Sequence, residues 1–449
     1  MRDLEMKEFI RRMTSRFGIE ISKTPERHLL ETVSVKPDTA CAGNVLLSYR
    51  TQPFLLKEED PRMNDHITNW DCLMLGKAFL ELGYSLDVIH WQNNKFLPEK
   101  DYAFFIDVHA NLERIGTRLG GSCTKILRTV WAHWLFNNTA EYQRCLSLQQ
   151  RRGVSIRPKR QLEPASAIEH ADCAIVMGNQ FTVGTYSFVR KPIYRVPVSA
   201  QAMYPWRVGK DYERCRKNFL WFGGYGLVHK GLDLVLEAFA GMPDLHLFVC
   251  GLIDKEGDFL KAYHRELYET ENIHTVGWVD VDSPKFLEIA DSCIGLIYPS
   301  CSEGQSGCVA NCLHAGLLPI ISYESGVDVE GFGVILDDCS VEAIRDSVHG
   351  ISRLPFGELR TMSQRAWEYA RSNHTLESVQ AQFRRVIDDI LRDNGSHKGS
   401  GEIVESRKPL SGKKAESGAV HVRGVPAEPI EREERNSAQA LHLDERSIR

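Results

Sequence analysis

A glycine-rich segment, WFGGYGLVHKGLD (221–233), has the residue types of a phosphate-binding turn. An apolar run ends in Gly223 and Gly224, Gly226 follows, and a helical pattern begins after Lys230. Glycines let the backbone approach a ligand closely, and a helix start offers unpaired N–H groups and positive potential to an anion. Lys230 would place a cation beside that anion. The alternative is a plain structural turn before a helix.

A second loop, within YPSCSEGQSGCVANCLHAGLLPIIS (298–322), has a carboxylate where a strand is expected to end. The apolar run before the loop predicts a strand, and the residues after it predict a helix and then another strand. Open α/β sheets bind ligands at such carboxyl ends of strands. Glu303 lies in this loop and could accept directed hydrogen bonds from ligand hydroxyls. The alternative is an exposed glutamate that caps the helix.

Twelve cysteines are scattered along the chain, and none forms a C-x-x-C pair. Most lie in apolar runs such as LFVCG and SCIGLIYP, which predicts buried, reduced thiols. Cys308 and Cys312 have the spacing of one helical face, and Cys301 is nearby. A zinc site there would need ligands from elsewhere in the chain, so we expect no metal.

Apolar runs alternate with helical patterns in two successive series. The first series predicts strands at 44–50, 84–91, 101–110, 129–136 and 171–178, and helices at 66–83 and 139–150. The second predicts strands at 218–226, 245–251, 272–279, 293–300 and 317–324, and a helix at 232–242. Continuous apolar strands that alternate with helices are typical of parallel sheets covered on both faces. We therefore predict an α/β chain with two doubly wound parallel-sheet domains.

The expected organisation starts with a polar leader and ends with a polar tail. Residues 1–40 form the leader, which contains one helix. The N-terminal domain comprises residues 41–205, the C-terminal domain comprises residues 206–375, and a last helix spans residues 376–392. Residues 393–449 contain no aromatic residue and are rich in Gly, Ser, Glu, Lys and Arg. Such a segment cannot bury enough apolar surface to offset its ordering entropy, which predicts a disordered tail. A partner-docking element is the alternative.

Composition excludes several classes of protein. The 449 residues are 43% hydrophobic and 26% charged, and the net charge of −5 gives no basic excess for binding nucleic acid. No run approaches the ~18–20 apolar residues of a membrane span. The charged N-terminal pattern lacks the apolar centre of a signal peptide. We therefore expect a cytoplasmic protein.

The motifs of the second series resemble those of a known family. FGGYGLVHKGLDLVLEAF, LHLFVCG, NIHTVGWV, IYPSCSEGQSG and HAGLLPIIS follow one another as in the family-4 glycosyltransferases of GT-B fold. The resemblance is strong over 218–340 and fainter over 44–200. It implies two Rossmann-like domains that face a cleft, with the acceptor bound mainly by the first and the nucleotide-sugar donor by the second.

The resemblance also implies an activity. A sugar, of hexose type, would pass from a nucleoside-diphosphate sugar to a saccharide or lipid-linked acceptor with retention of configuration. The reaction would need neither a cofactor nor a metal. Polysaccharide or glycolipid assembly is the implied role, and peripheral association with the inner face of the membrane is compatible with it. The sequence names neither the sugar, the base nor the acceptor.

Individual residues inherit expected roles from the resemblance. Lys230 matches the lysine that holds the donor diphosphate, and Glu303 matches the first of two glutamates and would contact the transferred hexose. The other expected donor-binding residues are Gly223, Gly224, Gly226, Gly304, Gln305, Ser306, Gly307 and Asn311. His109 or His133, each at the end of an expected strand, would face the sugar near the reacting carbon. The sequence does not choose between the two histidines.

Two positions depart from the family pattern. Gly224 stands where family members usually have arginine, which removes one cation from the diphosphate site; His229 is a candidate replacement. Asn311 stands where the second glutamate is expected, although an amide can still bond a ribose hydroxyl. These departures leave open a catalytically weakened sugar-nucleotide-binding or scaffold protein. A GT-B enzyme of another type, an epimerase or a phosphorylase, is a further alternative.

Overall fold

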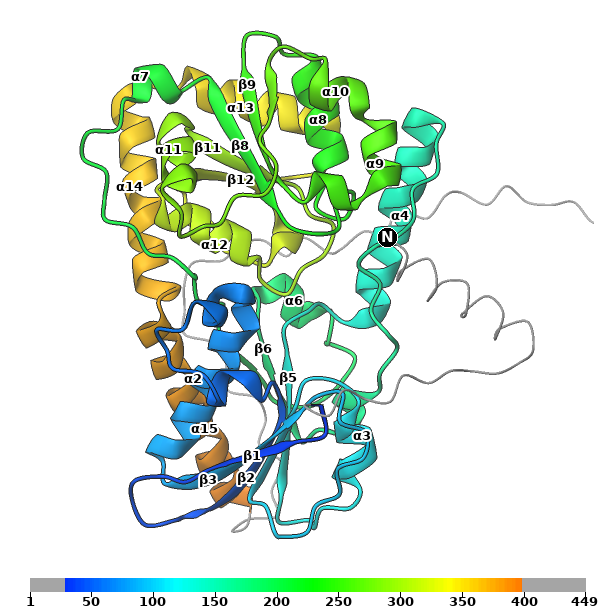
Figure 1. The fold of residues 1–449 in the computed structure, drawn as a ribbon, viewed down its shortest axis with the longest axis vertical. Coiled ribbons are helices and arrows are strands. Elements are labelled where there is room, and N and C mark those ends of the chain that lie inside the picture. The colour runs from blue at the N-terminus through cyan, green and yellow to red at the C-terminus, as the bar shows by residue number, and fades with distance from the viewer. Residues whose placement is uncertain (1–28, 398–449) are drawn as a thin grey trace, which may run out of the picture. The chain divides into compact units, whose positions relative to one another are not determined.

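The computed structural model describes residues 29–397, which contain two β-sheets (Figure 1). The strand order is β1-β3-β2-β4-β5-β6-β7 in the first sheet and β10-β9-β8-β11-β12-β13 in the second. Neighbouring strands pair in parallel, except that β1 runs antiparallel to β3. Both sheets belong to one compact unit.

The first sheet has helices on both faces. Its strands are β1 (Thr32–Val35), β2 (Gly43–Tyr49), β3 (Tyr84–His90), β4 (Phe104–Asp107), β5 (Thr124–Thr129), β6 (Cys173–Val176) and β7 (Ile193–Arg195). The helices around it are η2 (Gln52–Phe54), η3 (Pro61–Asp65), α2 (Ile67–Glu81), α3 (Asn111–Gly116), α5 (Ala167–His170), α6 (Gln180–Gly184) and α15 (Leu376–His397). Val45 and Leu47 of β2 belong to a core with α2 and α15, whereas Leu46 belongs to a core with α3 and α5.

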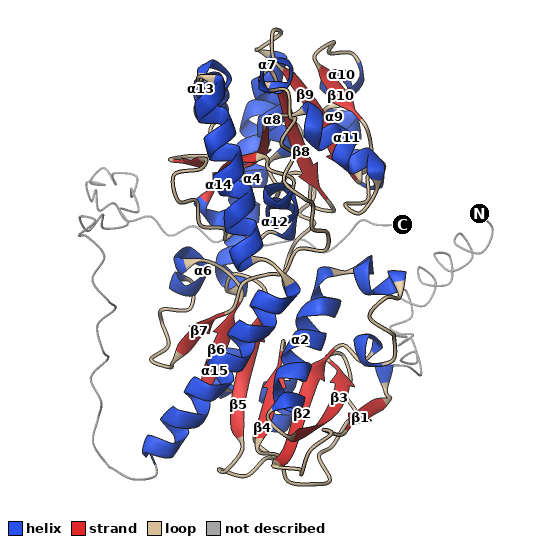
Figure 2. Cartoon of the chain, turned by 90° about the vertical axis from the view of Figure 1, so that its left-hand side faces the viewer, coloured by secondary structure: helices blue, strands red, loops and turns tan. Residues whose placement is uncertain are grey.

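The second sheet is covered in the same way (Figure 2). Its strands are β8 (Asn218–Gly223), β9 (His246–Gly251), β10 (Ile273–Thr275), β11 (Gly295–Tyr298), β12 (Leu318–Ser322) and β13 (Val334–Leu336). The accompanying helices are α7 (Tyr212–Cys215), α8 (Leu232–Ala240), η4 (Ile253–Lys255), α9 (Gly257–Ala262), α10 (His264–Tyr268), α11 (Pro284–Ser292), α12 (Gly307–His314), η5 (Tyr323–Ser325), α13 (Val341–Arg353) and α14 (Phe356–Asn373). Trp221 of β8 faces α8 and α13, and Phe222 faces α11 and α12. Burial on both faces explains the continuous apolar runs.

The predicted strand at 129–136 is wrong. β5 ends at Thr129, and helix α4 (Trp134–Arg152) begins after a short connection. The apolar residues of this connection line a cavity, described below, rather than a sheet core.

Two further differences concern the ends of the chain. β1 lies inside the predicted polar leader; its residues are exposed or half-buried, as suits an edge strand, and give no apolar signal. The last helix continues to His397, five residues beyond its predicted end at 392. The predicted leader helix before residue 29 and the predicted tail after 397 lie outside the described residues. The domain boundaries near 205 and 375 stay predictions.

Helix α4 connects the two sheets. It begins after β5 of the first sheet, and Leu148 near its end is fully buried in a core of the second sheet. Arg151 Nη2 lies 2.6 Å from Asp233 of α8, and Arg152 Nη1 lies 2.7 Å from Glu266 of α10. The C-terminal end of α4 is therefore anchored to the helices and core of the second sheet.

A buried ion pair anchors the C-terminal helix to the first sheet. Arg128 of β5 is fully buried, and its Nη2 lies 2.5 Å from Asp71 Oδ1 of α2. The hydroxyl of Tyr49 donates to the other oxygen of Asp71 at 3.1 Å. The Arg128 guanidinium lies 4.9 Å from the ring centroid of Phe383 on α15. Each charge depends on the other, because an unpaired charge in this core is costly.

We expect Arg128→Met to lower the free energy of unfolding by about 3–5 kcal/mol, because Asp71 would lose its counter-ion. Urea denaturation of the full chain measures this loss. The double variant Arg128→Met/Asp71→Asn should recover much of it, because no buried charge then remains. A loss below about 1 kcal/mol, typical of exposed pairs, would contradict the expectation.

Candidate active site

Lys230 and Glu303 come from separate segments and meet in a buried ion pair. Lys230 lies in the turn between β8 and α8, and Glu303 in the loop between β11 and α12; β8 and β11 are adjacent parallel strands. Lys230 Nζ is 2.6 Å from Glu303 Oε1. The Tyr298 hydroxyl accepts from Lys230 at 2.6 Å and donates to the same carboxylate oxygen at 2.9 Å. The structure thus brings together the two residues with the clearest predicted roles.

Burial and the neighbouring cations determine the charges of the site. Burial alone would raise the pKa of Glu303, but the positive charges of Lys230 and Arg160 outweigh burial and lower this pKa to about 2. Burial lowers the pKa of His229 to about 4, and Arg160 and Lys230 act in the same direction. His229 Nε2 lies 2.5 Å from the Ser302 carbonyl and must donate to it, so Nε2 carries the proton. At neutral pH Glu303 is charged and His229 is neutral, so His229 does not replace the missing cation.

The glycine turn is only partly available to a ligand. Gly223 ends β8, and an added Cβ there would lie 2.7 Å from the Trp221 ring. At Gly224 an added Cβ would meet nothing within 4 Å. The N–H of Gly226 donates to the buried carboxylate of Glu256 at 2.6 Å, and the N–H of Leu227 donates to it at 3.1 Å. Gly226 is a predicted donor-binding residue, but an internal carboxylate already occupies its N–H.

The loop after Glu303 packs against the first sheet and its connections. The Gly304 carbonyl accepts from Thr182 Oγ1 at 2.8 Å, and an added Cβ at Gly304 would meet the Val130 carbonyl. The side chain of Gln305 accepts from Val198 N at 2.7 Å. These contacts hold the loop close to residues 130–131, which follow β5.

The remaining loop residues begin helix α12. Ser306 is its N-cap, and its hydroxyl accepts from Val309 N at 3.4 Å. Gly307 is the first helical residue, and an added Cβ there would lie 2.5 Å from Ile67 Cδ1. The side chains of Gln305 and Ser306, two of the predicted donor-binding residues, thus make contacts within the protein.

Asn311 has a structural role that the sequence did not indicate. Its side chain is buried, and Oδ1 accepts from the main-chain N–H groups of Gln201 at 3.0 Å and Ala202 at 3.2 Å. Its Nδ2 donates to the Gly307 carbonyl at 2.9 Å. The amide therefore ties α12 to the connection between the sheets. The predicted ribose contact would have to displace these bonds.

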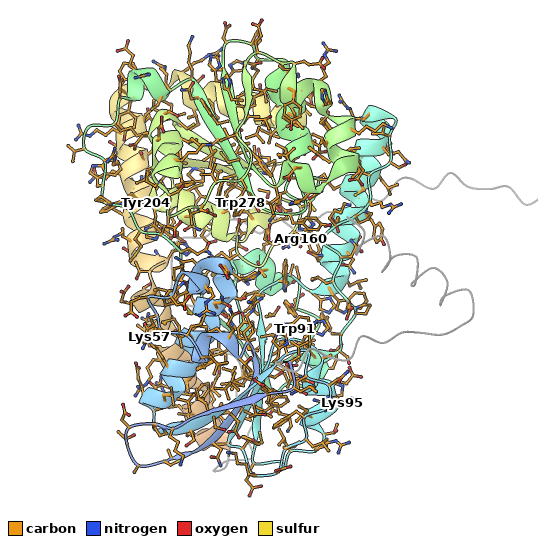
Figure 3. The ribbon with its side chains drawn as sticks, viewed as in Figure 1. Lys57, Trp91, Lys95, Arg160, Tyr204 and Trp278 are labelled. Carbon is orange, nitrogen blue, oxygen red and sulfur yellow. The ribbon has the colours of Figure 1, made fainter. Side chains whose placement is uncertain are left out.

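His109 and His133 line one cavity of about 410 Å³ beside the carboxyl ends of β4 and β5. Its walls include Trp91, which Figure 3 labels, and Trp131. The ring centroids of His109 and Trp91 lie 5.5 Å apart. Burial lowers the pKa of His133. The structure brings both candidate histidines together and does not choose between them.

The cavity borders the loop that contains Glu303. Val130 and Trp131 line the cavity, and the same two residues border Gly304, next to Glu303. A group bound in the cavity would therefore lie near the loop that contains the carboxylate.

Three charged residues of the site were not singled out from the sequence: Glu141, Arg160 and Glu256. Glu141 of α4 is buried and accepts from the main-chain N–H groups of Lys159 at 2.8 Å and Arg160 at 2.9 Å. The only local signal is the basic run RPKR (157–160), which does not reveal where its side chains lie.

Within residues 29–397, no group of three or more His, Cys, Asp or Glu side chains is arranged to hold a metal ion. In that range Cys301 and Cys312 are buried free thiols, and Cys308 is a half-buried one. None of the described helices combines the length and apolar character needed to cross a membrane. Independence from metals stays a prediction.

Comparison with solved structures shows the fold. Sucrose-phosphate synthase from Thermosynechococcus elongatus is similar over 78% of this chain and 99% of its own, with a TM-score of 0.54 and 15% identity. HepE from Anabaena, solved with UDP-glucose, is similar over 64% of this chain and 79% of its own, with a TM-score of 0.46 and 10% identity. No protein-family model and no curated protein matches the chain. The two parallel sheets and the first similarity show that the chain has the predicted GT-B fold.

The neutral state of His229 predicts a pH dependence of stability. The unfolded histidine takes up a proton below about pH 6.5, whereas the folded one stays neutral down to about 4. The unfolded state therefore binds more protons in this window, and stability falls as pH decreases. We expect His229 to contribute roughly 3 kcal/mol to this fall between pH 6.5 and 4.

His229→Gln should therefore lose less stability than wild type over this window, as urea denaturation at successive pH values would measure. Gln keeps a donor for the Ser302 carbonyl but does not titrate. His264→Gln, at an exposed position, is the control and should follow wild type. Parallel curves for wild type and His229→Gln would contradict the neutral assignment.

Proposed function

We propose that the chain transfers a sugar from a nucleoside-diphosphate sugar to a hydroxyl group of a saccharide acceptor. One observation carries the proposal: a buried lysine–carboxylate pair lies at the strand ends of the second sheet, and an aromatic cavity of the first sheet borders the same loop. A lysine near a helix start suits a diphosphate, and a carboxylate suits the hydroxyls of a hexose. The GT-B fold supports this division between donor and acceptor.

The ion pair provides a way to bind the donor. Without donor, Glu303 is the counter-ion of Lys230. A diphosphate that approaches Lys230 replaces this counter-ion, because charge-assisted bonds to phosphate are strong. Glu303 Oε1 is then available to accept from a hydroxyl of the hexose. Donor binding thus exchanges one buried charge pair for two contacts with the ligand.

The reaction needs stabilisation of the leaving group. As the bond between the anomeric carbon and the phosphate oxygen breaks, negative charge grows on the diphosphate. Lys230 and the nearby start of α8 stabilise that charge in the transition state. In a retaining, front-face transfer the leaving phosphate oxygen takes the acceptor proton while the acceptor oxygen bonds to the anomeric carbon. This chemistry needs no pair of catalytic carboxylates, unlike glycoside hydrolysis.

The aromatic cavity is the proposed acceptor site. Its volume lies within the usual range of ligand pockets. Trp91, Trp131 and Trp134 offer flat apolar surfaces on which the C–H faces of a sugar ring can pack, and His109 and His133 can bond its hydroxyls. Arg50 and Glu163 are the charged residues of the lining, which favours a neutral saccharide, free or as the head of a lipid-linked acceptor. Polysaccharide or glycolipid assembly in the cytoplasm is the compatible role.

A second candidate function is sugar-nucleotide binding without efficient transfer. Two predicted donor-binding residues favour it, because their polar groups already form hydrogen bonds within the protein. The Gly226 N–H donates to Glu256, and the Asn311 side chain bonds main-chain groups. Turnover distinguishes the two candidates, because a binding protein would retain the nucleotide but release no product.

Lys230→Ala tests the proposed leaving-group role. We expect kcat/KM for transfer to fall at least ~100-fold, because a lost charge contact in a closed site typically costs a few kcal/mol. Release of nucleoside diphosphate in the presence of saccharide acceptors measures it. Lys255→Ala, at an exposed lysine, is the matched control and should retain wild-type activity. A folded Lys230→Ala variant with unchanged kcat/KM would refute the role.

Glu303→Gln should separate transfer from nucleotide binding. Transfer should fall at least ~10-fold, because a neutral amide binds the hexose hydroxyl less strongly than a carboxylate. Affinity for the free nucleoside diphosphate should stay the same or increase, because Lys230 no longer has an anionic competitor. Calorimetric titration and a transfer assay measure the two effects. Wild-type turnover, or weaker binding of the free nucleoside diphosphate, would contradict this assignment.

A further inference from the structure

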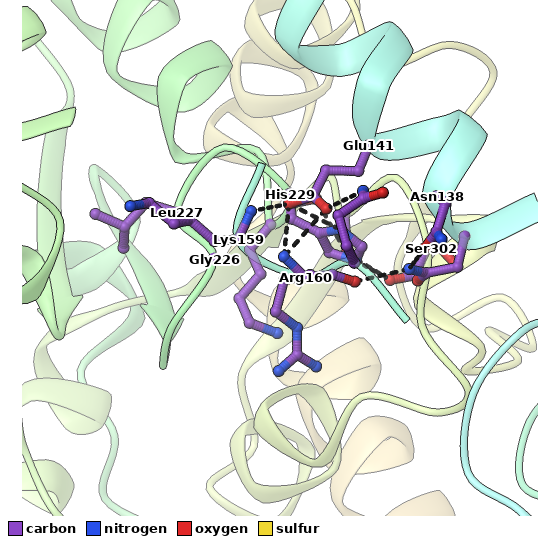
Figure 4. Close-up of polar contacts among 12 residues, drawn as sticks. Asn138, Glu141, Lys159, Arg160, Gly226, Leu227, His229 and Ser302 are labelled. Carbon is purple, nitrogen blue, oxygen red and sulfur yellow. Dashed lines mark hydrogen bonds and ion pairs between the residues drawn. The ribbon is translucent and has the colours of Figure 1, made fainter. Parts of the chain in front are cut away.

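Arg160 lies in the segment that follows α4, where Figure 4 shows it near Glu141 and His229, and its charge acts on Glu303. Its guanidinium carbon lies 4.4 Å from the ring centroid of Trp131. Its aliphatic stem passes Gly226, where an added Cβ would lie 2.8 Å from Arg160 Cδ. Gly226, at a φ of 91°, is therefore needed for space as well as for backbone conformation. The glycine turn and Arg160 fit against each other.

The main chain of Arg160 is fixed by buried side chains of α4. Its N–H donates to both oxygens of Glu141, at 2.9 and 3.1 Å. Its carbonyl accepts from Asn137 Nδ2 at 2.8 Å. Glu141 also accepts from Gln161 Nε2 at 2.6 Å. Because none of these bonds involves the guanidinium, the position of the residue does not depend on its charge.

The charge of Arg160 has no acidic partner among the described residues. No ion pair within residues 29–397 includes it, whereas its neighbour Lys159 lies 3.7 Å from Asp258. Its side chain is half-buried, and Nε is buried without a hydrogen-bond partner. The guanidinium nevertheless acts on the site, because it lowers the pKa values of Glu303 and His229. A partly buried cation without an acidic partner can bind an anionic ligand without first breaking an ion pair within the protein.

We infer that Arg160, which packs against the glycine turn at Gly226, is a second diphosphate-binding cation of the donor site and acts with Lys230. The inference rests on the proposed function. Gly224 supplies no side chain, and His229 is neutral at physiological pH. Arginine suits this place, because its planar fork can bond two phosphate oxygens at once. The second cation of the site thus comes from the segment after α4 rather than from the glycine turn.

Calorimetric titration with pyrophosphate, UDP, GDP and ADP tests the inference. Arg160→Gln keeps a polar side chain beside Trp131 but removes the charge, and Lys159→Gln is the matched control one residue away. We expect Arg160→Gln to weaken binding of the preferred nucleoside diphosphate at least ~10-fold, and Lys159→Gln to change it less than ~2-fold. Affinity for the nucleoside alone should not change. Arg160→Lys should give an intermediate affinity, because it keeps the charge without the fork.

The outcomes separate this inference from the proposed function. Equal affinity of folded Arg160→Gln and wild type for the preferred nucleoside diphosphate would overturn the role of Arg160 and leave the proposed function intact. A different result would support the role of Arg160 but contradict the proposed function. In that result, wild type binds pyrophosphate and Arg160→Gln does not, while no nucleotide binds more tightly than pyrophosphate. Failure of wild type to bind any of the four probes would overturn both.

Discussion

The buried ion pair between Lys230 and Glu303 imposes the central constraint on this structure. Each side chain is only 8% exposed, and a charge buried to this extent is costly unless it is paired. The turn after β8 and the loop after β11 must therefore stay within hydrogen-bond distance of each other. Adjacent parallel strands meet this requirement, because their carboxyl ends lie at the same edge of the sheet.

The surroundings of the pair depend on the first sheet. Gly304 packs against Val130, Thr182 bonds the Gly304 carbonyl, and Arg160 adds positive charge from the segment after α4. Helix α4 fixes this segment through Glu141 and is itself anchored in a core of the second sheet. The site is therefore formed by both sheets, although its two principal charges belong to one. Helix α4 therefore sets the position of Arg160 near the pair.

The sequence was sufficient for features encoded by local pattern. Lys230 follows an apolar run and glycines, and Glu303 lies in a polar loop between a strand and a helix; both positions and most strands of the two sheets agree with the structure. The prediction of a strand at 129–136 failed because apolar residues that line a cavity resemble those of a sheet core. β1 was missed because an exposed edge strand carries little apolar signal.

Residues whose role depends on distant partners could not be predicted. Asn311 bonds the main chain at Gln201, and Arg160 meets Gly226, in each case through contacts that no local spacing reveals. The same reason explains why Glu256, which occupies the N–H of Gly226, was not singled out. His109 and His133 had equivalent positions after strands, and the structure places both on one cavity, so they stay alternatives.

Binding of nucleotide sugars to the wild-type chain tests the central proposal most directly. A thermal-shift panel of UDP-, GDP- and ADP-linked sugars, with the free sugars and nucleosides as controls, would measure it. A ligand present at about 100 times its dissociation constant adds roughly 2.7 kcal/mol of stability, enough to raise the melting temperature measurably. The proposal predicts that one base series stabilises the protein and that its free sugar and nucleoside do not. No stabilisation by any nucleotide sugar would contradict it.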